Sequence, residues 1–367
     1  MTRTIALYLP QFHPIEENDR WYGKGFTEWR SVAGARPLFR GHNQPRIPAD
    51  LGFYDLRLPE TRYAQANLAK EHGVDGFAYY HYWFGNGKRL LERPFQSILL
   101  DKDYTFPFML HWANGSWYRK LWRADKTKDT LLVEQKYLGR DDAINHFYTL
   151  LPAFTDPRYM RIEGKILFTI DSPLDSEQLP MILDVWRELA SKEGIGDFFF
   201  LAHIAHNQEW LALKDGGIDY YLRQQNGKGY DGLIDSQYRK VLYLNLREKS
   251  KFRLRQALRL PNVYSYRDAI SKVVSEIDRD SRVFPEVFPN FDHSPRSKGR
   301  ELIYVGDSPE LFRQYMCEIL QAIRDKPDSR QIVFVRAWNE WGEGNYLEPD
   351  TKNGLSYLEA LRNALEK

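Results

Sequence analysis

Two glutamates three positions apart, Glu340 and Glu343, lie in the segment RAWNEWGEGNYLEPD at residues 336–350. If the chain turns helically there, their side chains face the same way with Cβ atoms about 5–6 Å apart. Retaining glycosidases hold two carboxyl groups about 5–5.5 Å apart, and so close a pair can share one proton. On a surface helix this spacing usually has no function. Here it follows an apolar run and lies among tryptophan and asparagine, which favours a catalytic pair.

The glutamate pair needs a strand to position it, and the sequence contains eight short apolar runs typical of strands. They cover 4–9, 74–83, 106–112, 165–170, 197–204, 218–222, 283–291 and 331–338. Helices are predicted at 59–72, 141–151, 177–193, 265–277 and 308–325. Because strands and helices alternate, we expect an α/β fold, namely a (β/α)8 TIM barrel. An open doubly wound sheet is the main competitor, but no G-x-G-x-x-G turn follows the first run.

Length and composition favour one large domain. A chain of 367 residues with 43% hydrophobic residues can form a single (β/α)8 catalytic domain over 1–367, with an insertion at about 226–262 after the sixth strand. The net charge of +2, from 52 basic and 50 acidic residues, gives no overall field that attracts nucleic acid, so we expect no such partner. Cys317 is the single cysteine, which excludes an intrachain disulfide and a cysteine-based zinc cluster.

Seven of the eight runs end in, or are soon followed by, residues able to bind a ligand, and a barrel gathers these ends on one face. The candidate substrate-binding residues are Tyr8, Gln11, His13, Tyr80, His81, Tyr82, Trp83, Trp112, Asn114, Trp117, Asp171, His203, Asp292, Arg296, Trp338, Asn339 and Trp341. The 10 Trp, 23 Tyr and 21 Phe suit a sugar ligand, because an aromatic face covers its C–H surface while polar neighbours bind its hydroxyls. Most of these rings are nevertheless expected in the core.

Histidines raise the question of a metal site. His203 and His206 have neither an H-E-x-x-H pattern nor facial carboxylate spacing around them, so we expect no metal and no cofactor. His13 lies between prolines, where packing and lining the pocket are equally good explanations.

The segment 239–259 holds eight basic residues and one acidic residue. A solvated helix face is the ordinary explanation. The functional alternative is that the segment attracts an anionic glycan, a lipid-linked phosphate or the cytoplasmic membrane surface. No run reaches the roughly 20 apolar residues that cross a bilayer, and the start lacks a signal-peptide pattern. We therefore expect a cytoplasmic protein, peripheral to the inner membrane if 239–259 makes that contact.

Four segments carry a resemblance to a known family: ALYLPQFHPIEENDRWYGKGFTEW, PADLGFYDLRLPE, GFAYYHYWFGNGKRLLERPF and WNEWGEGNYLEPD. They resemble the WbsX-like proteins of bacterial polysaccharide gene clusters, from Ile5 to about Leu361. That group is similar to glycoside hydrolase family 99, endo-acting α-mannosidases and α-mannanases on (β/α)8 barrels, chiefly through NEWGEG. The resemblance implies that Glu340 acts as base on the sugar 2-hydroxyl, through an epoxide-like intermediate. It implies that Glu343 is the acid and base at the glycosidic oxygen.

Two positions depart from the pattern of the WbsX-like group. Gly115 and Ser116, in WANGSW, stand where that group usually has a glutamate. His293, in FDHSPR, replaces its usual asparagine, whereas Asp292 and Arg296 are kept. Both changes fall at predicted strand ends, so they affect the choice of sugar more than the class of reaction.

Three functions stay open, each with an oligosaccharide or polysaccharide partner. The first is a retaining glycoside hydrolase acting on a bacterial surface polysaccharide or its precursor. The second is a glycosyltransferase of lipopolysaccharide, capsule or O-antigen biosynthesis. The DKD at 101–103 follows a helix-like stretch and not a strand, which gives a nucleotide-sugar donor little support. The third is a glycan-binding protein without catalysis, for which the missing carboxylate at Gly115 is the best argument.

Overall fold

A closed barrel of parallel strands forms the centre of the protein. The computed structural model describes residues 2–120, 129–205, 217–219, 221–222, 229–240 and 246–366. The barrel strands are β1 (Arg3–Tyr8), β2 (Gly76–His81), β3 (Phe108–Trp112), β7 (Lys165–Ile170), β8 (Phe198–Ile204), β9 (Gly232–Ser236), β11 (Val283–Val287) and β13 (Ile332–Val335). Each strand pairs in parallel with the next in this order, and β13 pairs with β1, so the ring has no free edge. The predicted (β/α)8 barrel is confirmed.

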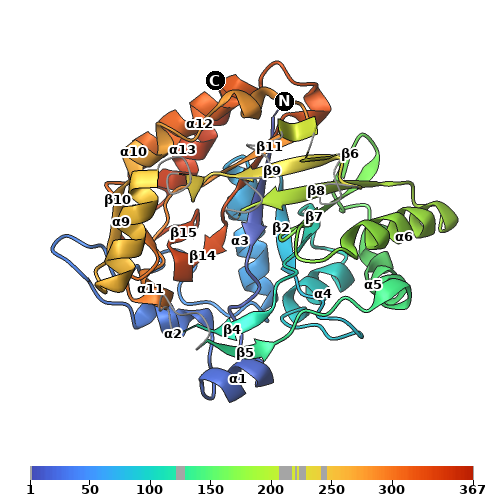
Figure 1. The fold of residues 1–367 in the computed structure, drawn as a ribbon, viewed down its shortest axis with the longest axis horizontal. Helices are drawn as coiled ribbons and strands as arrows, with labels where there is room; N and C mark the ends of the chain where they lie inside the picture. Colours follow the sequence, from blue (N-terminus) through green and yellow to red (C-terminus); the bar gives the residue numbers. More distant parts are fainter. Residues whose placement is uncertain are drawn as a thin grey trace.

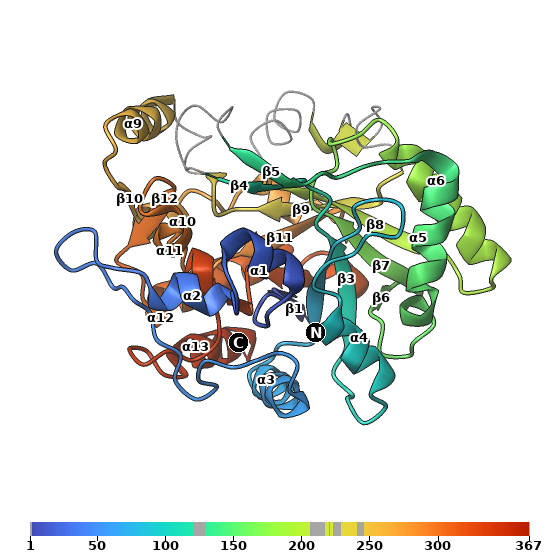
Figure 2. The same cartoon turned by 90° about the horizontal axis from the view of Figure 1, so that it is seen from below.

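Helices surround the strands (Figures 1 and 2). The long ones are α3 (Pro59–Glu71), α4 (Arg93–Leu100), α5 (Gly139–Phe154), α6 (Leu179–Lys192), α12 (Pro309–Ile323) and α13 (Ser356–Leu365). Helix α12 shows why they form: Phe312, Met316 and Ile319 recur at three- and four-residue spacing and are buried. The hydroxyl of Ser308 accepts a hydrogen bond from the Leu311 N–H and caps the helix start.

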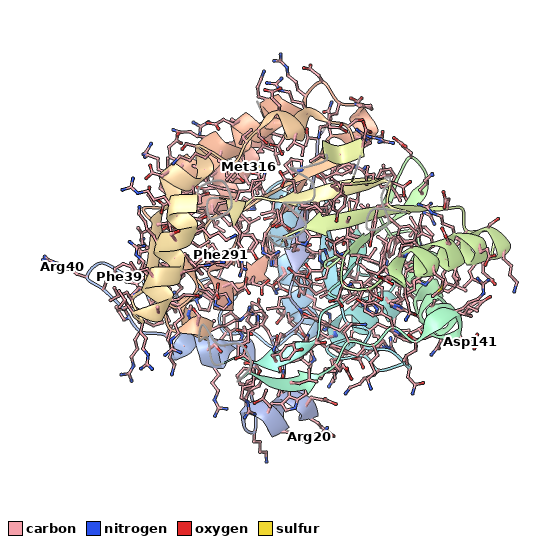
Figure 3. The ribbon with its side chains drawn as sticks, viewed as in Figure 1. Arg20, Phe39, Arg40, Asp141, Phe291 and Met316 are labelled. Carbon is pink, nitrogen blue, oxygen red and sulfur yellow. The ribbon has the colours of Figure 1, made fainter. Side chains whose placement is uncertain are left out.

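Most of the described apolar side chains are buried inside the molecule, and most of the described charged side chains reach its surface. Phe291 and Met316 are fully buried, and Figure 3 shows them inside the molecule. Arg20, Arg40 and Asp141 point away from the body at its margin in the same view (Figure 3). Within the described residues, none of the helices is both long and apolar enough to span a membrane.

Further elements add to the barrel at its ends, among them the 12-residue helix α9. They are α1 (Glu16–Tyr22), α2 (Glu28–Ala33), β4 (Trp117–Arg119), β5 (Thr130–Val133), β6 (Arg161–Ile162), α9 (Leu246–Ala257), β10 (Asn262–Ser265), α10 (Tyr266–Ile270), η2 (Glu276–Arg279), α11 (Ser294–Ser297), β12 (Leu302–Val305), η3 (Asp328–Arg330), β14 (Asn339–Glu340), η4 (Trp341–Glu343) and β15 (Asn345–Tyr346). β4 pairs with β5 and β14 with β15, both antiparallel, whereas β10 and β12 are parallel.

Seven of the eight predicted strands are confirmed, and the sixth is wrong. The described residues of 218–222 are helical, and the sixth barrel strand is β9 instead. The aromatic and β-branched content of IDYYL favours a strand locally, but pairing with β8 and β11 selects GLIDS. β9 therefore lies inside the range 226–262 that the sequence predicts as an insertion. Helix α9 does follow it, and the division into domain and insertion stays a prediction.

Four of the five predicted helices match α3, α5, α6 and α12. The predicted helix at 265–277 is only partly correct, since α10 ends at Ile270 and the next helical turn is η2. Ser275 caps η2 together with Asp278, and this capping box starts a new short element instead of extending α10.

Replacing Gly232 by alanine should destabilise the barrel. A β-carbon at this position would lie 2.4 Å from the Arg282 carbonyl oxygen and 3.1 Å from side-chain atoms of Leu201 and Phe284. The strand is hydrogen-bonded on both sides, so we expect a loss of about 1–3 kcal/mol in urea-induced unfolding, as in an overpacked core. Gly115→Ala is the control, because its β-carbon meets nothing within 4 Å. Equal stability of the two variants would contradict the register of β9.

Candidate active site

The two glutamates of the sequence motif line one cavity at the C-terminal end of β13. The chain leaves β13 through β14 and makes a single 3-10 turn, η4, which carries Glu343 back beside Glu340. Both side chains line a cavity of about 440 Å³. Residues of α1, α2, β4 and α11 form other parts of its wall. A space of this size suits a small saccharide.

Arg296, on α11, connects the pair. Its Nη1 donates to Oε1 of Glu343 at 2.6 Å and to Oε1 of Glu340 at 3.1 Å. Its Nε donates to Oε1 of Glu28, on α2, at 2.8 Å. Because one nitrogen contacts both pair members, their oxygens cannot be farther apart than these two distances combined. The close approach that the spacing of three predicts is therefore present.

Gly342 makes this ion cluster possible. A β-carbon at this position would lie 2.1 Å from Oε1 of Glu28 and 2.7 Å from Nε of Arg296. Any larger residue would displace the ion pair that passes across the turn. A glycine is therefore required between the two glutamates because no side chain fits there, and not because of its backbone conformation.

The pair holds one proton below about pH 7. Burial, helped by the charge of Glu343, raises the pKa of Glu340 to about 7, although Arg296 and Arg336 act in the opposite direction. Burial would also raise the pKa of Glu343. Instead Arg296 and the His293 ring, whose Nε2 lies 3.4 Å from Oε1, hold the pKa of Glu343 well below its usual range. In the unliganded protein, Glu340 is thus the protonated member.

Aromatic and amide side chains that the sequence predicts for sugar binding reach this cavity. Gln11, Tyr82 and Trp117 line it together with Arg296. The Tyr82 and Trp117 rings meet edge to face with centroids 5.0 Å apart, and Trp117 is only partly buried. A half-exposed indole beside a pair of carboxyl groups is a surface on which a sugar ring can stack.

Other candidates on β2 and β1 face the outer helices. The Tyr8 hydroxyl donates to Gln65 on α3 at 2.7 Å. Nε2 of His81 lies 2.7 Å from Nε2 of His146 on α5, and the Trp83 ring stacks on His146 at 4.3 Å. Successive strand residues point to opposite faces, so only alternate positions can face the barrel axis. The structure does not bring these three side chains to the cavity.

Trp112 and Asn114 are also engaged away from the cavity. Trp112 is buried against His146, and the Asn114 amide donates to the Tyr137 hydroxyl and to the Ser172 carbonyl, each at 2.9 Å. These contacts fix the loop that carries Trp117. The two residues support the cavity wall without forming it.

The remaining residues of the glutamate motif hold the turn in place. The Leu9 N–H donates to Oδ1 of Asn339 at 2.7 Å, and Nδ2 of Asn339 donates to the Leu9 carbonyl at 3.1 Å. Nε1 of Trp341 donates to Glu348 at 2.6 Å. Trp338 is fully buried and packs against Phe77. The Asn339 contacts fasten the turn that carries the two glutamates to the end of β1.

Asp292 and His13 are buried outside the cavity. The Asp292 carboxylate accepts from Gln44 at 2.6 Å and lies 2.9 Å from Nε2 of His42. His13 is 1% exposed, and burial lowers its pKa to about 4, so it is neutral at physiological pH. Both residues therefore pack within the protein and do not reach the cavity.

A second polar cluster lies inside the barrel. Oδ1 of Asp171 lies 2.8 Å from Nδ1 of His203 and 3.3 Å from Nε2 of His111, beside the ring of Tyr80. Nε2 of His203 lies 3.0 Å from the Glu286 carboxylate. The ligand atoms of His111, Asp171 and His203 are within 4.8 Å of one another, close enough to share a metal ion.

The charges of this cluster are also balanced by a proton. Burial acts to lower the pKa of His203, but Glu286 and Asp171 outweigh it and raise that pKa to about 9. The imidazolium then links two carboxylates. Chain spacing did not reveal this grouping because its members come from separate strands, and His206 lies outside the described residues. The expectation of no metal stays a prediction.

Glu28 is a site residue that sequence reasoning missed, as it missed Asn18, Tyr22 and Arg119, which also line the cavity. Glu28 is 3% exposed, lines the cavity and binds Arg296. Its segment, FTEW, shares with NEW a glutamate directly before a tryptophan. This repeated pattern within the segments that resemble the family is the signal that could have found it.

Known proteins resemble the chain over nearly its full length. A family model described as Glycosyltransferase WbsX matches residues 4–361. Two proteins from strains of Xanthomonas campestris pv. campestris, each called Uncharacterized protein WxcX, are 36% identical over 368 residues. The alignments cover 99% of this chain and 49% of each relative. The chain therefore spans about half the length of the curated relatives that it matches.

Solved structures share the fold. One called Glycoside hydrolase-like protein has a TM-score of 0.62 at 14% identity, covering 99% of this chain and 93% of that chain. A GH99 endo-alpha-mannosidase from Bacteroides thetaiotaomicron has a TM-score of 0.54 at 13% identity, covering 99% and 96%. At these identities the likeness concerns the fold alone.

The His203 cluster should make stability depend on pH. The folded protein keeps a proton on His203 up to about pH 9, whereas an unfolded histidine loses it near 6.5. The proton on His203 stabilises the fold fully below about pH 6.5, and this contribution is lost as the pH rises towards 9. The free energy of unfolding should fall by on the order of 3 kcal/mol. Urea unfolding at about five pH values between 6 and 10 measures this change in the free energy of unfolding. His203→Gln should lack this difference, and an unchanged slope in the variant would contradict the protonated bridge.

Proposed function

The chain belongs to the WbsX family, and from this premise we propose that it is a retaining glycoside hydrolase. Its substrate would be a bacterial surface polysaccharide or its precursor, with mannosidase-type chemistry. One observation carries the proposal: Glu340 and Glu343 contact the same nitrogen of Arg296 and line one cavity. A close acid and base pair open to a ligand is what glycosidic bond cleavage requires.

The similar solved structures support a carbohydrate substrate. One of them is an endo-alpha-mannosidase, and its barrel covers almost all of this chain. The half-exposed Trp117 and the amide of Gln11 add surfaces for sugar rings and hydroxyls to the same cavity. Both side chains belong to this chain, so the argument does not need the part of the curated relatives that the chain does not match.

The roles of the two glutamates follow the family resemblance. Glu340 would take the proton of the sugar 2-hydroxyl, whose oxygen attacks the anomeric carbon. The glycosidic bond breaks as Glu343 gives a proton to the leaving oxygen. Glu343 would then deprotonate a water that opens the three-membered ring, while Glu340 returns its proton to the 2-oxygen. Two displacements at one carbon retain the configuration.

The proton has to move between the glutamates for these roles. In the unliganded protein Glu340 is protonated, because Arg296 and His293 keep Glu343 ionised. A substrate that takes the place of Arg296 at Glu343 would remove the larger of these two influences. Burial would then raise the pKa of Glu343, and the shared proton could pass to it.

A glycosyltransferase is the second candidate. The description of the matching family, Glycosyltransferase WbsX, favours it, and the barrel by itself does not decide between transfer and hydrolysis. A glycan-binding protein without turnover is the third. Formation of a new glycosidic bond from a sugar donor would select the second, and binding with intact substrate the third.

Glu340→Gln and Glu343→Gln should each abolish hydrolysis of oligosaccharides from bacterial polysaccharides. Each change removes a proton acceptor without changing side-chain size, so a loss of at least about 100-fold in kcat/KM is expected. Glu359→Gln is the control, because Glu359 lies exposed on α13. Product release measured by chromatography checks the result, and full activity in either variant would remove the proposal.

A substrate that needs no acid should separate the two roles. Fluoride leaves without protonation, so Glu343→Gln should recover the first step, measured as fluoride released in a single turnover from the glycosyl fluoride of a cleaved sugar. The later opening of the ring would still lack its base. Glu340→Gln should stay inactive, because the 2-hydroxyl still needs its base. Recovery in Glu340→Gln alone would reverse the assignment and would agree with the proton position in the unliganded protein.

The pH dependence of kcat/KM should be one-sided. The free protein keeps its shared proton below about pH 7, the pKa of Glu340, and loses it above. We expect a level region below pH 7 and a fall of about tenfold per pH unit above it. Because Arg296 and His293 hold the pKa of Glu343 well below its usual range, we expect no acid limb above the ordinary glutamate pKa of about 4.3. A rise in kcat/KM through pH 7 would contradict the need for the shared proton.

A further inference from the structure

We propose that helix α9 docks the protein on an anionic membrane surface. Three exposed leucines and a set of basic residues, all between 247 and 260, form what we call the α9 surface. Its members are Lys251, Arg253, Leu254, Leu258, Arg259 and Leu260.

The leucines of the α9 surface are largely exposed. Leu254, Leu258 and Leu260 are 59%, 60% and 50% exposed. Leu254 and Leu258 are four residues apart, and the Leu258 N–H donates to the Leu254 carbonyl at 2.9 Å, so both lie on one helix face. Leucines gathered on a surface mark a contact with something apolar.

The opposite face of α9 already holds the helix to the body. Phe252 packs against the core, and Nη1 of Arg255 donates to the Val263 carbonyl at 2.8 Å. Nε2 of Gln256 donates to the Arg300 carbonyl at 3.2 Å. With its inner face fixed in this way, the helix presents the leucines outward without needing to refold.

The charge of α9 selects an anionic partner. The helix LREKSKFRLRQA contains five basic residues and one acidic residue. The acidic one, Glu248, already accepts from Lys251 at 2.7 Å. Basic side chains around exposed leucines match the boundary of an anionic bilayer, where phosphates meet acyl chains. A soluble polyanion would match the charges but would leave the leucines in water.

The position of α9 fits a membrane-bound substrate. In Figure 2, α9 lies at the upper margin, on the side where β4 and β5 also lie, and Trp117 of β4 lines the cavity. Docking through α9 would bring this side of the barrel near the bilayer. Resting on the proposed function, the inference names a lipid-linked saccharide as the substrate class.

Flotation with vesicles tests the docking. The protein should float with phosphatidylethanolamine vesicles that contain phosphatidylglycerol and should stay behind with phosphatidylcholine vesicles. Added salt should release it, because charge attraction brings the basic residues to the surface. The double variant Leu254→Ser/Leu258→Ser and the double variant Lys251→Gln/Arg253→Gln should each lower the vesicle partition coefficient at least about tenfold, a loss of about 1.4 kcal/mol.

Leu100→Ser is the matched control, because Leu100 is 80% exposed at the end of α4, away from the α9 surface. Circular dichroism confirms that each variant is folded. Equal binding to both kinds of vesicle, no binding, or unchanged binding of the α9 variants would overturn the docking.

Hydrolysis of a soluble oligosaccharide distinguishes the two proposals. The α9 variants should keep it, because none of their residues lines the cavity. Vesicle binding without any hydrolysis would remove the hydrolase and leave the docking. Hydrolysis without vesicle binding would overturn the docking and leave the hydrolase.

Discussion

The guanidinium of Arg296 is the centre on which the site depends. It contacts Glu28, Glu340 and Glu343, which lie on α2, β14 and η4, and thereby fixes three separate segments. Three buried carboxyl groups repel one another unless positive charge lies among them. Burial, with the charge of Glu343 beside it, raises the pKa of Glu340, whereas Arg296 lowers the pKa of Glu343. The position of Arg296 thus divides the pKa values of the pair.

The arginine that brings the two glutamates together also takes up one carboxylate oxygen of each. Arg296 Nη1 uses the carboxylate oxygens that a sugar would need, and its side chain is 21% exposed in the cavity wall. A ligand must therefore exchange hydroxyl hydrogen bonds for those of the guanidinium. Because Nε stays tied to Glu28, the side chain has an anchor during that exchange. Gly342 leaves the space in which this anchor lies.

Sequence reasoning succeeded where one segment contained the whole signal. Apolar runs predicted seven strands, and the spacing of Glu340 and Glu343 predicted a close pair. It failed where the partner was remote: Glu28 and Arg296 are 268 positions apart, and β9 is selected by its neighbours and not by its own composition. The face of a strand was also undetermined, because a shift of one residue exchanges inside and outside. For this reason His81 was expected in the pocket and lies against α5.

The two departures from the family pattern act on different parts of the site. Gly115 leaves open space, since a β-carbon there meets nothing within 4 Å, and the neighbouring Ser116 lines the cavity. Under the proposed function, a carboxylate lost from this wall leaves one contact fewer for a sugar, while Glu340 and Glu343 stay in place. His293 instead contacts Glu343 at 3.4 Å and, unlike asparagine, can carry a positive charge. It adds to Arg296 in keeping Glu343 ionised, so this exchange acts on the proton of the pair, and the change at Gly115 acts on the fit of the ligand.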